Sequence, residues 1–271
     1  MPIRVLEPEV AGRIAAGEVV ERPSSVVKEL LENSLDAGAT RIDVTTTGGG
    51  IGSIVVSDNG VGIPEVDVPL VFQQFATSKI NRSEDLNSIN TLGFRGEAMY
   101  SISAVSEVEL ITRAVDEKVG VNINILEGNA GVISPAAANV GTKVAVRNLF
   151  INFPARKKFL RSQKSETGRI ATLVKRYSMI WPEISFSLSQ EGTRFFSTTG
   201  SGSFRDVIAA VYGVETSNGM ILIDSQGIDP EYLGPTLGGI IGSPSQTRAN
   251  RSHINIFVNG RYIQNRTLSY A

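Results

Sequence analysis

The feature that most constrains the fold is the way in which helical and strand-like segments follow one another without regular alternation. Residues 23–37 have the periodicity of an amphipathic helix, with a proline in the first turn and a glycine directly after it. Two segments rich in β-branched residues follow at 40–46 and 53–57, and the glycines at 48–50 predict a hairpin turn between them. Because helices and strands are mixed rather than strictly alternating, we expect an α+β fold with the helices on one face of the sheet.

The rest of the chain predicts further elements and one domain junction. Residues 198–203 are small or polar and offer no apolar anchor, which favours a junction there. A length of 271 residues suggests about two domains, so we expect a first domain at 1–201 and an incomplete second domain at 202–271. Three further helices are expected: one that begins within 93–98 and ends at 103, one at 156–177 and one at 204–211. Further strands are expected at 107–112, 119–126, 142–147, 184–188, 193–197, 237–242 and 253–258.

Composition excludes several kinds of chemistry. The chain has no Cys and a single His, so disulfides, zinc–thiolate sites, cysteine nucleophiles and multi-histidine metal centres are excluded. No apolar run is long enough to span a membrane and the first residues lack the apolar core of a signal peptide, so we expect a cytoplasmic protein with no membrane partner.

The net charge of −1 conceals a strong asymmetry along the chain. Residues 1–100 contain 14 acidic and 8 basic side chains, whereas residues 143–176 contain 10 basic side chains and only one acid. The last 31 residues contain four arginines and no acid. This pattern favours an anionic partner for the C-terminal half, although a solvated basic helix would look the same.

The helix at 23–37 carries a polar row opposite its apolar stripe. Glu29, Asn33 and Asp36 have i, i+4 and i+7 spacing and therefore share one face. They could supply a general base, an oxygen ligand for Mg²⁺ and a polar anchor, because Mg²⁺ prefers hard oxygen ligands and keeps several waters or substrate oxygens. A solvated helix face is the alternative interpretation.

Three further motifs could bind parts of a nucleotide. Asp58 to Gly62 follows a strand, where Asp58 could accept a hydrogen bond from an exocyclic amine and the glycines permit close approach of a ligand. Gly93 to Ala98 places glycines at a helix start, where backbone N–H groups bind phosphate, and residues 77–79 add two hydroxyls and an ammonium. An Asx-Gly turn, a capped helix and a polar surface loop are the respective alternatives. The Walker and GxGxxG phosphate motifs are both absent.

Taken together and in order, these motifs resemble the MutL family of DNA mismatch repair ATPases, a branch of the GHKL group. The resemblance covers essentially the whole chain, and Gly93–Ala98 together with the first helix and Ala76–Lys79 is its most specific part. It is carried by Ile14–Val20, the Glu29, Asn33 and Asp36–Gly38 helix, Asp58, Gly60 and Gly62, Ala76–Lys79, and Gly93–Ala98.

The resemblance implies a two-layer α/β sandwich of the GHKL (Bergerat) type, followed by a partial second α/β domain. It implies Mg²⁺-dependent ATP hydrolysis in which Glu29 is the catalytic base, Asn33 holds Mg²⁺ and Asp58 binds the adenine amino group. The nucleotide-binding residues that it implies are Asn33, Asp36, Asp58, Gly62, Thr77, Ser78, Lys79, Leu92, Gly93, Phe94, Arg95, Gly96, Glu97, Ala98 and Thr142.

The resemblance also implies a clamp on DNA. ATP would drive dimerisation with a second copy or a paralogue, and the clamp would couple a MutS-type mismatch-recognition protein to downstream repair enzymes, at the nucleoid in bacteria or in the nucleus in eukaryotes. DNA binding would be largely independent of sequence and sensitive to salt. The DNA-binding residues that it implies are Arg156, Lys157, Lys158, Arg161, Arg261 and Arg266.

Two alternatives remain at this point. Family members carry a lysine beyond the position of Ala271 that reaches the γ-phosphate, so this chain could be a nucleotide-gated DNA-binding module without effective hydrolysis. It could also be another GHKL ATPase, such as a topoisomerase subunit or a chaperone. We expect no endonuclease domain within these residues.

Overall fold

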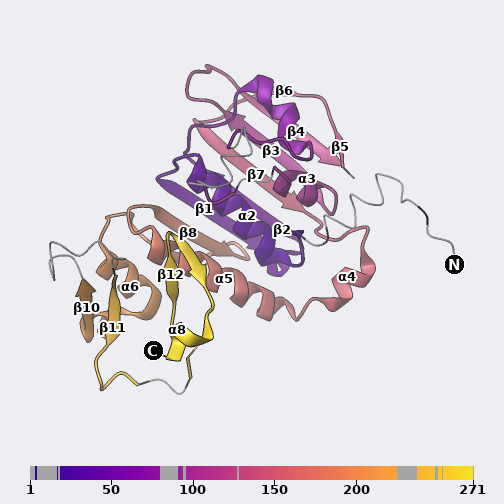
Figure 1. Cartoon of the computed structure of the whole chain (residues 1–271). Helices are drawn as coiled ribbons and strands as arrows, with labels where there is room; N and C mark the ends of the chain where they lie inside the picture. The colour runs from indigo at the N-terminus through magenta and orange to yellow at the C-terminus, as the bar shows by residue number, and fades with distance from the viewer. Residues whose placement is uncertain are drawn as a thin grey trace.

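A computed structural model describes residues 4, 17, 19–79, 91–93, 96–126, 128–224, 237–247, 250–251 and 253–270. Its main feature is a nine-stranded sheet with helices on one face (Figure 1). The α+β, two-layer architecture expected from the sequence is confirmed. No helix in the described ranges is long and apolar enough to cross a membrane.

The sheet has the strand order β5-β4-β3-β7-β2-β1-β8-β9, with β6 paired to β4. Only β1 and β8 pair in parallel; the other pairs are antiparallel. The predicted hairpin is present, because Thr47 pairs with Ser53 around the short helix η1 (Gly48–Gly50). The strands are β1 (Arg41–Thr47), β2 (Ser53–Asp58), β3 (Glu107–Arg113), β4 (Gly120–Leu126), β5 (Asn129–Ala130), β6 (Ser134–Ala136), β7 (Gly141–Arg147), β8 (Ser185–Gln190) and β9 (Thr193–Ser197).

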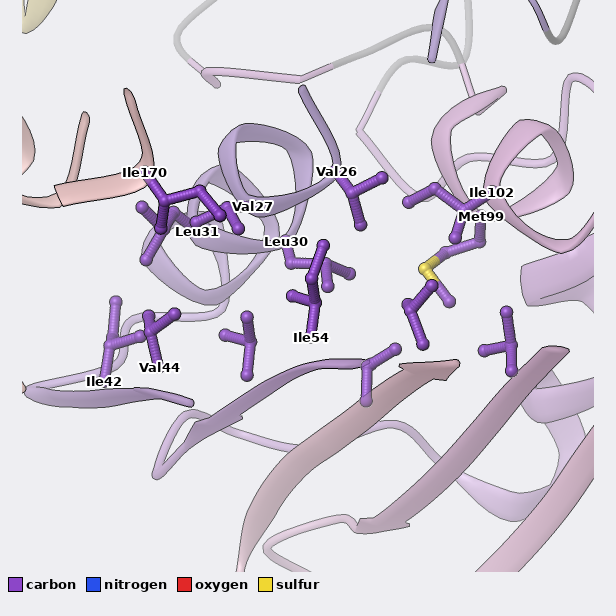
Figure 2. Close-up of a cluster of buried hydrophobic side chains, with 14 of the residues drawn as sticks. Val26, Val27, Leu30, Leu31, Ile42, Val44, Ile54, Met99, Ile102 and Ile170 are labelled. Carbon is purple, nitrogen blue, oxygen red and sulfur yellow. The ribbon is translucent and has the colours of Figure 1, made fainter. Parts of the chain in front are cut away.

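Alternation along the strands places the core on one face of the sheet. In β1, Ile42 and Val44 are buried while Arg41 and Thr45 are exposed, as the period of two requires. The buried face packs against α2 (Pro23–Asp36), α3 (Ala98–Ser103) and α5 (Gln163–Ile180). Figure 2 shows the apolar stripe of α2 pointing at the side chains of the sheet and of α5; it labels Val26, Val27, Leu30, Leu31, Ile42, Val44, Ile54, Met99, Ile102 and Ile170.

The C-terminal part forms a smaller unit beside the end of α5. Its apolar cluster is built on Met179, Val207 and Ile208, so α5 contributes to both cores. The unit contains two separate two-stranded ribbons, β10–β11 and β12–β13. Its elements are α6 (Phe204–Tyr212), α7 (Val214–Asn218), β10 (Met220–Asp224), β11 (Gly238–Gly242), β12 (Ile256–Val258), β13 (Arg261–Ile263) and α8 (Arg266–Tyr270).

Two predicted elements differ in detail from the structure. Residues 156–177 are largely helical, as expected, but they are divided between two helices, α4 (Pro154–Phe159) and α5, by non-helical backbone at Leu160 and Ser162. Ser162 ends the break by capping α5, since its side chain accepts a hydrogen bond from the Ser165 N–H. The last predicted strand begins only at Ile256, and His253 instead stacks on Tyr212 with ring centroids 5.3 Å apart.

Several short elements were not predicted. They are η2 (Glu65–Phe72), the ribbon strands β10 and β13, the edge strands β5 and β6, and the helices α7 and α8. The strands and the two helices have five residues or fewer, and so few residues do not define an apolar face. The helix η2 was not predicted because it contains an internal proline, Pro69, and proline disfavours a helix interior.

Candidate functional site

The polar row of α2 meets the segment 77–79 at one end of the helix. The Lys79 ammonium lies 2.6 Å from Asp36 Oδ2 and 3.2 Å from Asn33 Oδ1. The Asp36 side chain is 8% exposed and that of Lys79 is 21% exposed, so solvent screens this ion pair only weakly. The structure therefore brings Lys79, which the sequence could relate to the helix only by resemblance, onto two residues that already share one helix face.

A second segment of the chain converges on the same carboxylate. The backbone N–H groups of Leu92 and Gly93 donate to Asp36 at 2.9 and 3.1 Å. We call residues 91–93 the Asp36-bound loop. Its N–H groups were expected to face phosphate, and in this structure they are engaged by a carboxylate, which presents the same kind of anionic oxygen.

Asp58 lies at the C-terminal end of β2 and accepts three hydrogen bonds. The donors are the Ser34 hydroxyl at 2.8 Å, the Gly60 N–H at 2.9 Å and the Thr142 N–H at 3.3 Å. Thr142 is joined further to Thr112, whose hydroxyl lies 3.0 Å from its own. These bonds connect α2, β2, β3 and β7 and hold the Asp58 carboxylate in one orientation.

Two glycines of the predicted motifs are required by geometry. Gly62 has φ +74°, and a Cβ there would overlap the carbonyl oxygen of Arg113. Gly96 has φ +63°, and a Cβ there would overlap the carbonyl oxygen of Ala76. Only glycine combines this backbone conformation with such close approach of a neighbouring chain.

The other predicted nucleotide residues lie at varying distance from this cluster. Thr77 accepts a hydrogen bond from the Lys79 N–H at 3.2 Å, and the Ser78 side chain is exposed. Glu97 precedes α3 as its N-cap residue, and Ala98 is the first residue of α3. Phe94 and Arg95 lie outside the described residues.

Glu29, the predicted catalytic base, is paired with Lys28, which was not predicted as a site residue although its i,i+4 spacing to Glu32 on a helix favours an ion pair. The Lys28 ammonium lies 3.1 Å from Glu29 and 2.8 Å from Glu32. Burial lowers the pKa of Lys28, but the charges of Glu29 and Glu32 and the hydrogen bonds to them raise it by more, so that its pKa lies above the usual value. Lys28 therefore stays charged at neutral pH and holds both carboxylates.

Glu32 in turn connects α2 to α5. The Tyr177 hydroxyl donates to the buried Glu32 carboxylate at 2.6 Å. Burial, and then the adjacent Glu32 charge, raise the pKa of Tyr177 well above its usual value. No sequence signal pointed to this pair, because the two residues are 145 positions apart and each lies on its own helix.

The donor set suits a single Mg²⁺ ligand rather than a protein-built metal cage. Asn33 Oδ1 already accepts a hydrogen bond from the positively charged Lys79 ammonium, so this oxygen is placed to bind a cation. Within the described residues there is no group of three or more His, Cys, Asp or Glu side chains that could hold a metal ion. One amide oxygen completed by phosphate oxygens and water is the arrangement that Mg²⁺ commonly accepts.

The predicted DNA-binding residues fall on three parts of the surface. Lys157 and Lys158 are exposed on α4, Arg161 is exposed just after it, and Arg266 is exposed at the start of α8. Arg156 is half-buried, with its guanidinium carbon 4.8 Å from the Phe153 ring centroid and directly against Gly17. Arg261 reaches the Asp36-bound loop and donates to the Thr91 carbonyl at 2.9 Å.

Family comparisons agree with this geometry. The family described as "Histidine kinase-, DNA gyrase B-, and HSP90-like ATPase" matches residues 18–199, and "DNA mismatch repair protein, C-terminal domain" matches residues 208–271. The chain is 48% identical to the DNA mismatch repair protein MutL of Desulforamulus reducens over 98% of its own length and 41% of the relative's. It is 46% identical to MutL of Lactococcus lactis subsp. lactis, again over 98% of its length and 40% of the relative's. The chain thus spans about two fifths of the length of these curated relatives.

Solved structures lead to the same group. The Aquifex aeolicus MutL ATPase domain complexed with ADP superposes with a TM-score of 0.71 at 32% identity, covering 93% of this chain and 87% of that domain. The N-terminal domain of a DNA repair protein superposes with a TM-score of 0.81 at 28% identity, covering 97% and 82%. The chain therefore belongs to the histidine kinase-, DNA gyrase B- and HSP90-like ATPases and, among them, to the MutL family of DNA mismatch repair proteins.

Proposed function

We propose that this chain binds ATP at the end of α2 and hydrolyses it slowly to ADP and phosphate. The observation that carries the proposal is one polar cluster: Lys79 and the N–H groups of the Asp36-bound loop donate to the Asp36 carboxylate, and Lys79 also donates to Asn33 Oδ1. A similar domain that binds ADP supports the choice of nucleotide.

In this proposal, Asp58 accepts a hydrogen bond from the adenine amino group, and Gly62 forms part of the wall beside the base. The carboxylate is already oriented by Ser34, Gly60 and Thr142, so little reorganisation is needed when the base enters. The Ser34 hydroxyl was not predicted and acts here as a positioning group.

At the phosphate end of the nucleotide, Lys79 exchanges the Asp36 carboxylate for phosphate oxygens. Its ammonium leaves Asp36 and donates to phosphate oxygens, while the N–H groups of Leu92 and Gly93 turn to the same phosphates. Mg²⁺, held by Asn33 Oδ1, would neutralise charge on the phosphate oxygens. Thr77, Ser78 and residues 94–98 complete this part of the proposed site.

Glu29 accepts the proton of the attacking water as the P–O bond to the leaving ADP breaks. Lys28 holds the Glu29 carboxylate from one side, and Glu32 with Tyr177 holds Lys28. The base is therefore positioned by a chain of three charge-assisted bonds that ends on α5.

Beyond the site, we propose the behaviour that the family resemblance implies. ATP binding would favour dimerisation with a second copy or a paralogue, and the dimer would hold DNA through Arg156, Lys157, Lys158, Arg161 and Arg266. Residues 1–201 would act as the ATPase domain and 202–271 as part of a second, DNA-contacting domain. A MutS-type protein and downstream repair enzymes would be its partners, in the cytoplasm or at the nucleoid.

The test separates catalysis from binding. We expect Glu29→Ala to keep its affinity for Mg·ATP while single-turnover hydrolysis falls by about 10²–10⁴-fold, the range for loss of a general base. We expect Asn33→Ala to weaken binding of Mg·ATP but not of ATP in EDTA, because only the metal-dependent part is lost. Titration calorimetry and rapid-quench measurements on the same preparations provide both numbers.

Equal loss of nucleotide affinity in both variants would contradict this division of roles. A wild-type chain that binds Mg·ATP and shows no single-turnover hydrolysis would instead support a nucleotide-gated DNA-binding module. Comparison with a longer chain that continues past Ala271 would then show whether hydrolysis needs a group from beyond that residue.

A further inference from the structure

Arg261 makes a contact that its predicted role in DNA binding does not explain. Its guanidinium Nη2 donates to the Thr91 carbonyl at 2.9 Å, across 170 positions of sequence. Thr91 is the first residue of the Asp36-bound loop, and its hydroxyl donates to the Gly93 carbonyl at 2.8 Å. Arg261 therefore touches the same loop whose next two N–H groups are held by Asp36.

The ribbon that carries Arg261 is seated firmly on α5. The Arg176 guanidinium lies 3.8 Å from the centroid of the Tyr262 ring, and its Nε donates to Asn255 at 3.1 Å. Gly260, in the turn of the ribbon, faces Trp181, and a Cβ at this position would lie 3.2 Å from the indole ring. Because both ends of the ribbon are anchored, Arg261 reaches the loop from a defined position.

The same ribbon leads directly to a predicted DNA contact. Arg266 opens α8, immediately after β13, and its side chain is exposed. A phosphate that binds Arg266 and a nucleotide that repositions residues 91–93 would thus act on one continuous element, β12–β13–α8. The charge of Arg261 also lowers the pKa of Tyr177, against the larger effect of burial, which places the guanidinium within electrostatic reach of the α2–α5 junction.

We propose that Arg261 is a positioning residue that links nucleotide binding to DNA binding, rather than a DNA contact. When the Asp36-bound loop turns to the nucleotide, the Thr91 carbonyl moves with it, and Arg261 transmits that movement to the ribbon. Any such coupling must be reciprocal, so DNA bound at α8 strengthens nucleotide binding by the same factor. This inference rests on the proposed function, since it requires that both ligands bind.

The experiment measures the coupling factor itself. Fluorescence anisotropy gives the Kd for a labelled duplex of about three helical turns, with and without saturating Mg²⁺ and β,γ-imido ATP, at one low salt concentration. The ratio of the two Kd values is the coupling factor, which we expect to be about fivefold or more in the wild-type chain.

Two variants test the inference, Arg261→Ala and Arg261→Lys. Arg251→Ala is the matched control, because it also removes one arginine from the C-terminal unit. Arg251 instead stacks on Tyr270, with its guanidinium carbon 3.6 Å from the ring centroid.

We expect Arg261→Ala to reduce the ratio to about one and to weaken the nucleotide affinity of the chain without DNA. Arg261→Lys keeps the charge but has a shorter, single-point donor, so its ratio should be intermediate. Arg251→Ala should keep the wild-type ratio, even if its DNA affinity falls in both conditions. Thermal unfolding of each variant shows whether the fold is retained.

A wild-type ratio in Arg261→Ala would overturn the inference, and so would a ratio of one in the wild-type chain. If Arg261→Ala does not fold, a wild-type ratio in Arg261→Lys would overturn it in the same way. A wild-type chain that binds neither ligand would contradict the proposed function instead, so the two failures are distinct.

Discussion

At the scale of single residues, the turn after β2 depends on backbone conformation as much as on side-chain chemistry. Asp58 supplies the carboxylate, but the chain can return past β3 only because Gly62 adopts a positive φ against the Arg113 carbonyl. The residue that shapes the turn therefore has no side chain of its own.

We predict that Gly62→Ala lowers the free energy of unfolding by about 2–4 kcal/mol, because strain at positive φ adds to overlap with backbone that cannot easily move. Urea denaturation gives the measurement. Gly192→Ala is the matched control: Gly192 has φ +79°, yet nothing lies within 4 Å of its Cβ position, so about 1 kcal/mol is expected. Similar destabilisation of the two variants would mean that the close approach of Arg113 is unimportant.

At the scale of elements, α2 is the helix on which core and site meet. Leu30 and Leu31 are buried against the sheet, whereas Asn33, Asp36 and Lys79 form the polar cluster on the other side. Its neighbour α5 is attached by apolar packing and by the bond between Tyr177 and the buried Glu32 carboxylate. The position of the polar row thus depends on the α2–α5 junction.

We predict that Tyr177→Phe costs about 1–3 kcal/mol of unfolding free energy at pH 7, because a buried carboxylate oxygen loses its donor. The wild-type chain should also lose stability as the pH rises above about 10, since the unfolded chain releases the Tyr177 proton while the folded chain retains it. Tyr177→Phe removes that component, so the stability difference between the two proteins should shrink at alkaline pH by up to about 1.4 kcal/mol per pH unit.

Urea denaturation at neutral pH and at two pH values above the ordinary pKa of tyrosine measures this difference. Lys28, whose pKa is also raised, titrates in the same direction in both proteins, so the comparison between the two is what isolates Tyr177. Tyr270→Phe, at a residue that is 74% exposed, controls for the loss of a hydroxyl at neutral pH. A difference that stays constant with pH would contradict the role given to Tyr177.

At the scale of the whole molecule, the proposed function assigns ATP and DNA to different surfaces. The proposed nucleotide site lies between α2 and the loops beside it. The helices α4 and α8, whose basic side chains are exposed, lie near opposite ends of α5 (Figure 1). The sequence shows a matching division of charge: the first hundred residues are acidic, and a basic region follows them.

We predict that Lys157→Glu with Arg266→Glu weakens DNA binding and lowers the slope of log K against log salt by about two, one for each phosphate that is no longer neutralised. Arg41→Glu with Lys143→Glu changes the net charge equally but alters exposed residues on strands β1 and β7, and should leave the slope near its wild-type value. Equal slopes in the two double variants would assign DNA binding to overall charge or to another surface.

Prediction from sequence succeeded where a repeating pattern spans many residues. The long helix α2 and most strands of the main sheet lie within a residue or two of their expected limits, because a period of 3.6 or 2 is evident over such lengths. Residues 156–177 are largely helical as predicted, but the sequence did not locate the short break at 160–162, which interrupts a continuous run of basic and helix-favouring residues. In the C-terminal unit, α6 and β11 lie close to their expected limits, whereas β10, β13, α7 and α8 were not predicted.

The sequence by itself determined the mixed α+β class, the amphipathic character of α2 and the segments that carry polar chemistry. These are local properties, set by residues that are close together along the chain. Only the tertiary structure decided which polar groups meet: Ser34 and Thr142 at Asp58, Tyr177 at Glu32, and Arg261 at Thr91. Such contacts form between residues 24 to 170 positions apart, where the packing of helices and strands, rather than any local periodicity, sets the distance.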